Sequence, residues 1–135
     1  MHPEHQTPNT ESRPIDRFAT EVVGVEAVAV ARNYAKAKLV VQPRHYNGVG
    51  IVQGGAYFTL ADYAFALASN TDTETVVAIE VGMSYMKPTT SGTLYAEATL
   101  LTRSKSLVSY EIPITNEQGE LVARFYGRGF VRQPR

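Results

Sequence analysis

The sequence contains no cysteine. A disulfide framework, a thiolate metal site and a cysteine nucleophile are therefore excluded. The chain also lacks an excess of either charge, because 13 basic residues balance 13 acidic ones. Nothing in this balance favours a nucleic acid or a membrane surface as a partner, so an anionic ligand would have to meet a local basic patch.

Long hydrophobic runs are absent as well, since no stretch reaches the roughly 20 apolar residues that a membrane-spanning helix needs. The first residues, Met1–His5, contain no apolar core of the kind found in signal peptides, so we expect a cytoplasmic protein. What is present is a chain of 135 residues, 44% of them hydrophobic. That is enough for one globular domain with a substantial core and too little for two.

Residues 1–14 are predicted to be a flexible tail, and residues 15–135 a single domain. The tail is rich in proline and small polar residues, a composition that cannot bury enough surface to order itself. His2 and His5 lie in this segment. Histidines in a mobile, proline-broken segment are more often solvated than bound to metal, so we predict no metal site.

The most apolar segment of the chain, residues 53–69, is predicted to be a helix. Alanine and leucine supply seven of its positions, it contains no proline, and Asn70 and Thr71 after it favour a turn. Because the segment is apolar on every face, we expect the rest of the chain to wrap around it completely.

Asp62 is the one charged residue of this segment, and no other occurs between Arg44 and Asp72. Burying an unpaired carboxylate is costly or shifts its pKa strongly. A functional carboxylate is therefore expected here, and the alternative is a structural carboxylate that caps a buried loop.

The remaining segments predict a short helix and six strands. The helix is expected over residues 16–23, with Asp16 as N-cap and with Phe18, Val22 and Val23 on one side. Alternating β-rich runs occupy residues 25–31, 34–41, 75–86, 93–103, 107–115 and 120–132. In the last run, one face is predicted to hold Leu121, Ala123, Phe125, Gly127, Gly129 and Val131.

Strands on both sides of a single helix indicate an α+β fold with an antiparallel sheet rather than alternating βαβ units. We predict a strongly twisted sheet of five to six strands curled around one long central helix. The loop before that helix, residues 43–52, is a place where binding groups are expected to gather.

The segment His45–Gly55, followed by Leu60-Ala61-Asp62, resembles the hotdog-fold acyl-CoA thioesterases of the phenylacetate-pathway, PaaI-like branch. Residues 83–88 match the strand of that branch that ends in a basic residue and proline. The resemblance covers roughly residues 16–132. It implies a hotdog fold, an acyl-CoA substrate, no cofactor and a homodimer, and the sequence leaves open whether two dimers pair into a tetramer.

The resemblance also implies roles for individual residues. Asp62 would be the catalytic carboxylate, acting as nucleophile or as base for a water, with the Gly54 amide as oxyanion donor and Asn47 positioning the thioester or the water. Two positions depart from the pattern: Gln53 stands where this branch usually has histidine, and Ala78 where some members have a serine. The candidates for substrate binding are Gln53, Gly55, His45, Phe65 and Ala78.

The chemistry suits these residue types, because thioester hydrolysis places negative charge on a carbonyl oxygen that helix N-terminal amides can hold. Gly54 and Asp62 are eight residues apart, about 12 Å along a helix, whereas reacting groups must lie within about 3.5 Å. If both act on one carbonyl, they must come from different subunits. We therefore predict an obligate homodimer with two shared sites.

Purely structural roles stay open for the same residues. Gly54 and Gly55 can serve close helix packing, Asn47 a turn, Gln53 the helix start and His45 the shape of the loop. Coenzyme A phosphates would meet Arg or Lys, and the candidates are Arg103, Lys105, Arg124 and Arg128, although a polar strand face is the commoner explanation for such residues.

Two other functions remain open from the sequence. One is an acyl-CoA-binding module without hydrolysis, which the departures at Gln53 and Ala78 make possible. The other is a hotdog enoyl-CoA hydratase, which would need a histidine paired with an acid. His45 is the only histidine outside the predicted tail.

Overall fold

The protein is described by a computed structural model that covers residue 10, residue 13 and residues 15–132. His2, His5 and most of the predicted tail lie outside these residues. Within the tail segment, Arg13 is held against the domain, because its Nε donates a hydrogen bond of 3.1 Å to the carbonyl of Leu67.

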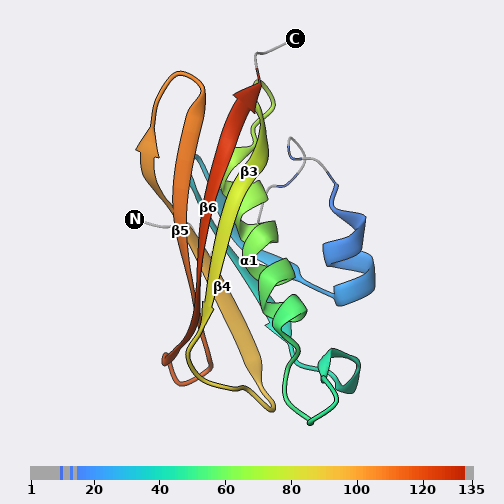
Figure 1. Ribbon diagram of the computed structural model, residues 1–135. Coiled ribbons are helices and arrows are strands. Elements are labelled where there is room, and N and C mark those ends of the chain that lie inside the picture. The colour runs from blue at the N-terminus through green and yellow to red at the C-terminus, as the bar shows by residue number, and fades with distance from the viewer. Residues whose placement is uncertain (1–9, 11–12, 14, 133–135) are drawn as a thin grey trace.

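One long helix, α1 (Gly54–Ser69), lies at the centre of the molecule (Figure 1). Gln53, the residue before the helix, has an extended backbone, and its side-chain oxygen accepts a hydrogen bond of 3.1 Å from the Gly55 amide. The helix ends at Asn70, whose side-chain oxygen accepts from the Val76 amide at 2.8 Å. The predicted helix is confirmed, with Gln53 as its cap.

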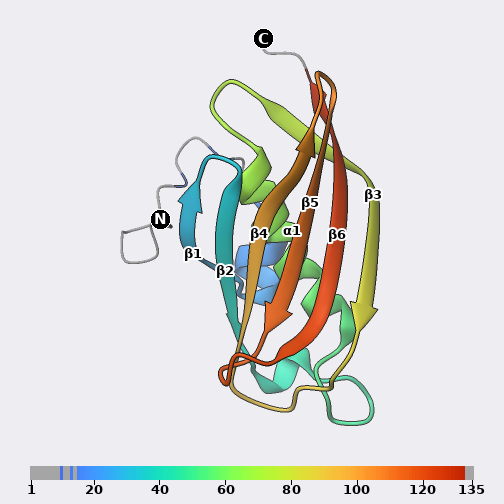
Figure 2. The same cartoon turned by 90° about the vertical axis from the view of Figure 1, so that its left-hand side faces the viewer.

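A six-stranded antiparallel sheet curls around α1, as Figures 1 and 2 show. The strands follow the order β1 (Glu26–Ala31), β2 (Tyr34–Val40), β4 (Thr93–Arg103), β5 (Leu107–Thr115), β6 (Leu121–Arg132) and β3 (Thr75–Tyr85). This arrangement confirms the predicted α+β fold. It leaves β1 and β3 as the two edges of the sheet.

The core lies between the concave face of the sheet and α1. Small residues of β2, Ala35 and Ala37, let the helix approach, and Phe65 from α1 packs against β6. A Cβ on Gly129 would lie 2.4 Å from Cγ1 of Val76 and 3.1 Å from the Phe65 ring. Glycine at this position of β6 therefore leaves room for Val76 of β3 and for Phe65 of α1.

The predicted face of the last strand is wrong at its first residue. Leu121 is 43% exposed, whereas Val122 is 1% exposed and belongs to the core. The pairing of β5 with β6 shifts between Ile114 and Thr115, so Val122 and Ala123 are both buried in succession. Such a bulge interrupts simple alternation at the strand end.

A short π-helix, η1 (Phe18–Val23), crosses α1 on the side opposite the sheet (Figure 1). The predicted cap is present, because Oδ1 of Asp16 accepts from the Ala19 amide at 2.9 Å. Ala19 is the buried residue of η1, whereas Phe18 and Val22 face outward.

The expectation that the chain wraps α1 completely is wrong. One stripe of the helix is exposed or only partly buried, formed by Gly55, Thr59, Asp62 and Ala66. The sheet covers only its own side of α1, and η1 has six residues against the sixteen of α1. Across the described part of the chain, no helix combines the length and the apolar character needed to cross a membrane.

Candidate active site

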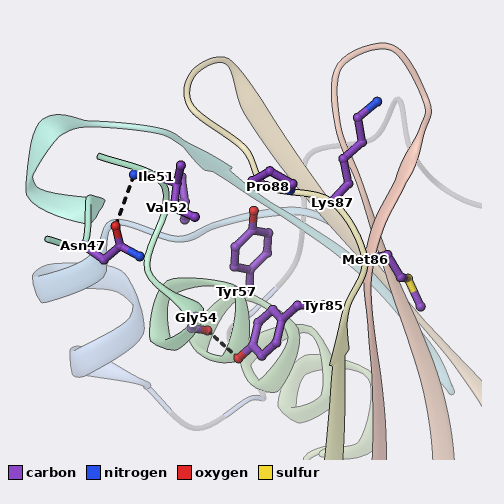
Figure 3. A pocket seen from close by; sticks show the side chains of 9 residues that line it. All are labelled: Asn47, Ile51, Val52, Gly54, Tyr57, Tyr85, Met86, Lys87 and Pro88. Carbon is purple, nitrogen blue, oxygen red and sulfur yellow. Dashed lines mark hydrogen bonds between the residues drawn. The ribbon is translucent and has the colours of Figure 1, made fainter. Parts of the chain in front are cut away.

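A cavity of about 510 Å³ opens at the N-terminus of α1 (Figure 3). It is built by the loop before α1, the first turn of α1 and the end of β3. Its wall is mostly apolar or aromatic and consists of Asn47, Ile51, Val52, Gly54, Tyr57, Tyr85, Met86, Lys87 and Pro88. Two of the predicted catalytic residues, Asn47 and Gly54, thus lie at the same cavity.

Asn47 organises the loop and still has a donor to offer. Its side-chain oxygen accepts from the backbone amides of Val49 and Ile51 at 3.0 and 3.2 Å. Its backbone amide donates to the Ile51 carbonyl at 2.8 Å. Its Nδ2 has no acceptor among the described residues. The turn role and a binding role are therefore compatible, because they use different atoms of the side chain.

His45 ties this loop to η1. The ring is 5% exposed, its Nδ1 accepts from the Gln42 amide at 2.9 Å, and its Nε2 lies 2.7 Å from the Val23 carbonyl. An accepting Nδ1 requires that Nε2 carries the proton and donates it to that carbonyl. Both ring nitrogens are thus used within the chain, and His45 is absent from the cavity wall.

The amide of Gly54 is the first of α1 and has no acceptor among the described residues. Helix N-terminal amides carry partial positive charge and bind anions readily. The neighbouring amide of Gly55 is already bonded to Gln53, so that side chain acts as a helix cap. Of the two glycines, Gly54 is the one whose amide is available.

Two tyrosines form one wall of the cavity. The rings of Tyr57 and Tyr85 meet edge to face, with centroids 5.6 Å apart, and the Tyr85 hydroxyl donates to the Gly54 carbonyl at 3.0 Å. Tyr57 is 3% exposed, and its hydroxyl has no partner among the described residues. Neither tyrosine is among the site residues that the sequence predicts, although Tyr85 belongs to residues 83–88, a segment that carries part of the resemblance.

Asp62 lies on α1 but not at this cavity. Burial, and to a smaller extent the nearby Asp16 carboxylate, raise the pKa of Asp62 above its ordinary value. No ion pair of the described residues includes it. At about 1.5 Å of rise per residue, the eight positions between Gly54 and Asp62 span about 12 Å.

Two further substrate candidates lie away from the cavity wall. Phe65 is 3% exposed and packs in the core against Tyr110 and Phe125. Ala78 is exposed on the edge strand β3, where it pairs with Gly129.

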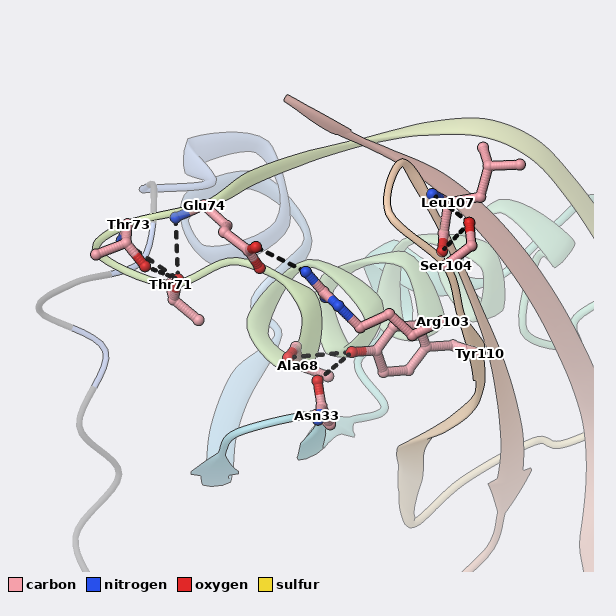
Figure 4. A network of polar contacts seen from close by, with 9 residues as sticks. All are labelled: Asn33, Ala68, Thr71, Thr73, Glu74, Arg103, Ser104, Leu107 and Tyr110. Atoms are coloured by element: carbon pink, nitrogen blue, oxygen red, sulfur yellow. Dashed lines mark hydrogen bonds and ion pairs between the residues drawn. The ribbon is translucent and has the colours of Figure 1, made fainter. Parts of the chain in front are cut away.

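None of the basic residues predicted to meet phosphates lines the cavity within one chain. Arg103 pairs with Glu74 at 2.6 Å, near the C-terminal end of α1 and beside Tyr110 (Figure 4). Lys105 lies in the turn that follows, and Arg124 pairs with Glu111. Lys87, the basic residue before the proline in residues 83–88, lines the cavity and pairs with Glu120 at 2.7 Å, although it is not among the predicted phosphate candidates.

Known proteins resemble this chain in sequence and in structure. The profile of the thioesterase superfamily matches residues 49–123. The acyl-coenzyme A thioesterase PaaI of Escherichia coli is 31% identical over 80% of this chain and 78% of its own length.

Two solved structures share the fold. The PaaI protein of the phenylacetic acid degradation operon of E. coli has a TM-score of 0.81 and 29% identity, over 85% of this chain and 84% of the other. The phenylacetic acid degradation protein PaaI of Thermus thermophilus has a TM-score of 0.80 and 34% identity, over 85% and 98%. The chain therefore belongs to the thioesterase superfamily, as a PaaI-like thioester hydrolase with the hotdog fold.

Proposed function

We propose that the protein hydrolyses a small to medium or aromatic acyl-CoA to the free acid and coenzyme A. The observation that carries this proposal is the unbonded amide of Gly54, which opens a helix beside a largely apolar cavity. A thioester carbonyl placed there would have its developing negative charge next to the helix N-terminus. The Nδ2 of Asn47 supplies a second donor at the same wall.

Asp62 is proposed as the nucleophile or as the base that activates a water. A carboxylate whose ionised form is poorly solvated is a stronger base than a free one, and its raised pKa reflects this. Because Asp62 and Gly54 are separated along one rigid helix, the Asp62 of the partner subunit would complete each site.

The edge strand β3 supports such a dimer. It has eleven residues, contains one charged side chain and exposes Val77, Ile79 and Val81. An unpaired, apolar edge strand readily pairs with another chain. Antiparallel pairing of β3 with its own copy about a two-fold axis would set the partially covered stripe of α1 beside the partner's cavity.

The experiment is a panel of acyl-CoAs from acetyl to palmitoyl, with phenylacetyl and benzoyl, read by release of free thiol. We expect turnover of the aromatic or shorter members with kcat in the usual range of about 1 to 1,000 s⁻¹. Saturable binding of acyl-CoA without thiol release from any of them would contradict the proposal and favour a binding module. Hydration of an enoyl-CoA is not expected, because both ring nitrogens of His45 are already bonded.

A further inference from the structure

Tyr85 lies directly against the residue proposed as oxyanion donor. It is the last residue of β3, separated from Gly54 by 31 positions in the sequence, and its hydroxyl donates to the Gly54 carbonyl at 3.0 Å. Figure 3 shows this bond at the mouth of the cavity, with Tyr85 reaching from the strand to the first turn of α1.

The absence of a side chain at position 54 is what makes room for this contact. A Cβ on Gly54 would lie 2.8 Å from the Tyr85 hydroxyl oxygen and 3.0 Å from Cζ of the ring. Real Cβ atoms do not approach that closely, so a larger residue at position 54 would force the Tyr85 hydroxyl to move. Glycine also leaves its own two backbone dihedrals unusually free, and a bond to its carbonyl limits that freedom.

The neighbouring ring holds Tyr85 in place. Tyr57 is buried in α1 and meets Tyr85 edge to face at an interplanar angle of 71°. Burial raises the pKa of Tyr85, and the nearby Tyr57 raises it further by a smaller amount. A tyrosine phenol is protonated at neutral pH in any case, and the raised pKa extends its role as a hydrogen-bond donor to higher pH.

We propose that Tyr85 is a positioning residue, which holds Gly54 from its carbonyl side so that the Gly54 amide stays directed at the cavity. The inference rests on the proposed function, in which that amide stabilises the oxyanion. Tyr85 also connects the helix start to the edge strand on which the proposed dimer forms, so assembly and the oxyanion donor are structurally linked.

The test compares Tyr85→Phe with Tyr126→Phe as the matched control. The first change keeps the ring against Tyr57 and removes only the hydroxyl. Tyr126 is 41% exposed on β6, with no hydrogen bond to its hydroxyl among the described residues. We expect kcat of Tyr85→Phe to fall about 3- to 10-fold, the effect of one hydrogen bond. KM should stay within about twofold, because this hydroxyl donates its hydrogen to the Gly54 carbonyl.

A second measurement does not depend on turnover. In ¹⁵N-labelled protein, the Gly54 amide resonance is followed in the wild type and in both variants. Loss of the tether is expected to shift or broaden this resonance in Tyr85→Phe, while Tyr126→Phe leaves it unchanged.

The outcomes separate this inference from the proposed function. An unchanged Gly54 resonance in Tyr85→Phe overturns the positioning role, and so does a raised KM with unchanged kcat, which would mark Tyr85 as a substrate contact. If the wild type hydrolyses no acyl-CoA, the proposed function fails, and the Gly54 resonance alone decides whether Tyr85 holds the helix start.

Discussion

At the scale of single residues, Asp62 is the group whose environment most clearly departs from that of an ordinary surface carboxylate. Its raised pKa arises from burial within its own subunit, with Asp16 adding a like charge. Desolvation penalises the ionised form, so the folded protein at neutral pH carries a cost that a neutral side chain would not. Such a cost is typical of a group retained for chemistry.

Asp62→Asn is expected to lower kcat by about 100-fold or more, the usual loss when a general base is removed. The same change should raise the melting temperature at pH 7. Because the folded-state pKa lies above the unfolded one, ionised Asp62 destabilises the fold above that pKa. The difference between variant and wild type should shrink as the pH falls and Asp62 becomes protonated. Thermal melts at several pH values, with thiol release at neutral pH, provide the measurement.

The control for this experiment is Asp72→Asn, which changes an exposed carboxylate in the loop after α1. It should alter neither kcat nor the pH dependence of melting in this way. A melting temperature of Asp62→Asn at or below that of the wild type at pH 7 would contradict the account of its burial, and full activity would remove its catalytic role.

At the scale of secondary-structure elements, β3 is the unusual member of the sheet. Its length and apolar exposure would be a liability in a monomer, since edge strands are normally short, charged or covered. One stripe of α1 is likewise left without a cover by the sheet and by η1. One partner subunit placed along β3 would cover both the edge strand and the stripe.

The double substitution Ile79→Lys with Val81→Lys should therefore weaken the proposed dimer. Across a two-fold axis each new charge is doubled, and like charges facing each other cost several kcal/mol, so the dimer dissociation constant should rise by about 100-fold or more. Sedimentation equilibrium would then report single chains of 14.8 kDa at concentrations where the wild type is paired.

Leu101→Lys is the matched control, because Leu101 is 51% exposed on the interior strand β4. It should leave the dimer intact. Activity should decline together with dimerisation in the β3 variant, and a fully active monomer would contradict shared sites.

At the scale of the whole molecule, the decisive property is that the Gly54 cavity and Asp62 are held apart by one rigid helix. In a dimer with shared sites, each cavity receives its carboxylate from the partner subunit. In a site confined to one chain, the helix would have to bend, and α1 is an unbroken helix of sixteen residues without proline.

Mixing two inactive variants distinguishes these cases. Asp62→Asn keeps a functional cavity, and Gly54→Val keeps the carboxylate but fills the space beside Tyr85. After unfolding and refolding together in equal amounts, half of the dimers are mixed and each of these has one intact site, so about a quarter of wild-type activity should return. If the mixture is no more active than its components, the site is not shared.

The sequence by itself determined the elements of this fold. Alternation and helix-forming composition are local properties, and they correctly placed β4 and β5, the helix that begins after Gln53, and the capping role of Asp16. The isolation of Asp62 and the position of Gly54 at the start of a helix were also readable, because both depend on neighbouring residues.

Only the tertiary structure decided which of these residues meet. Tyr85 reaches Gly54 across 31 positions, His45 uses both ring nitrogens to join its loop to η1, and Phe65 is placed in the core. The bulge at Val122 and the uncovered stripe of α1 have the same origin. Each depends on contacts between segments that are distant in the chain, and no local pattern specifies such contacts.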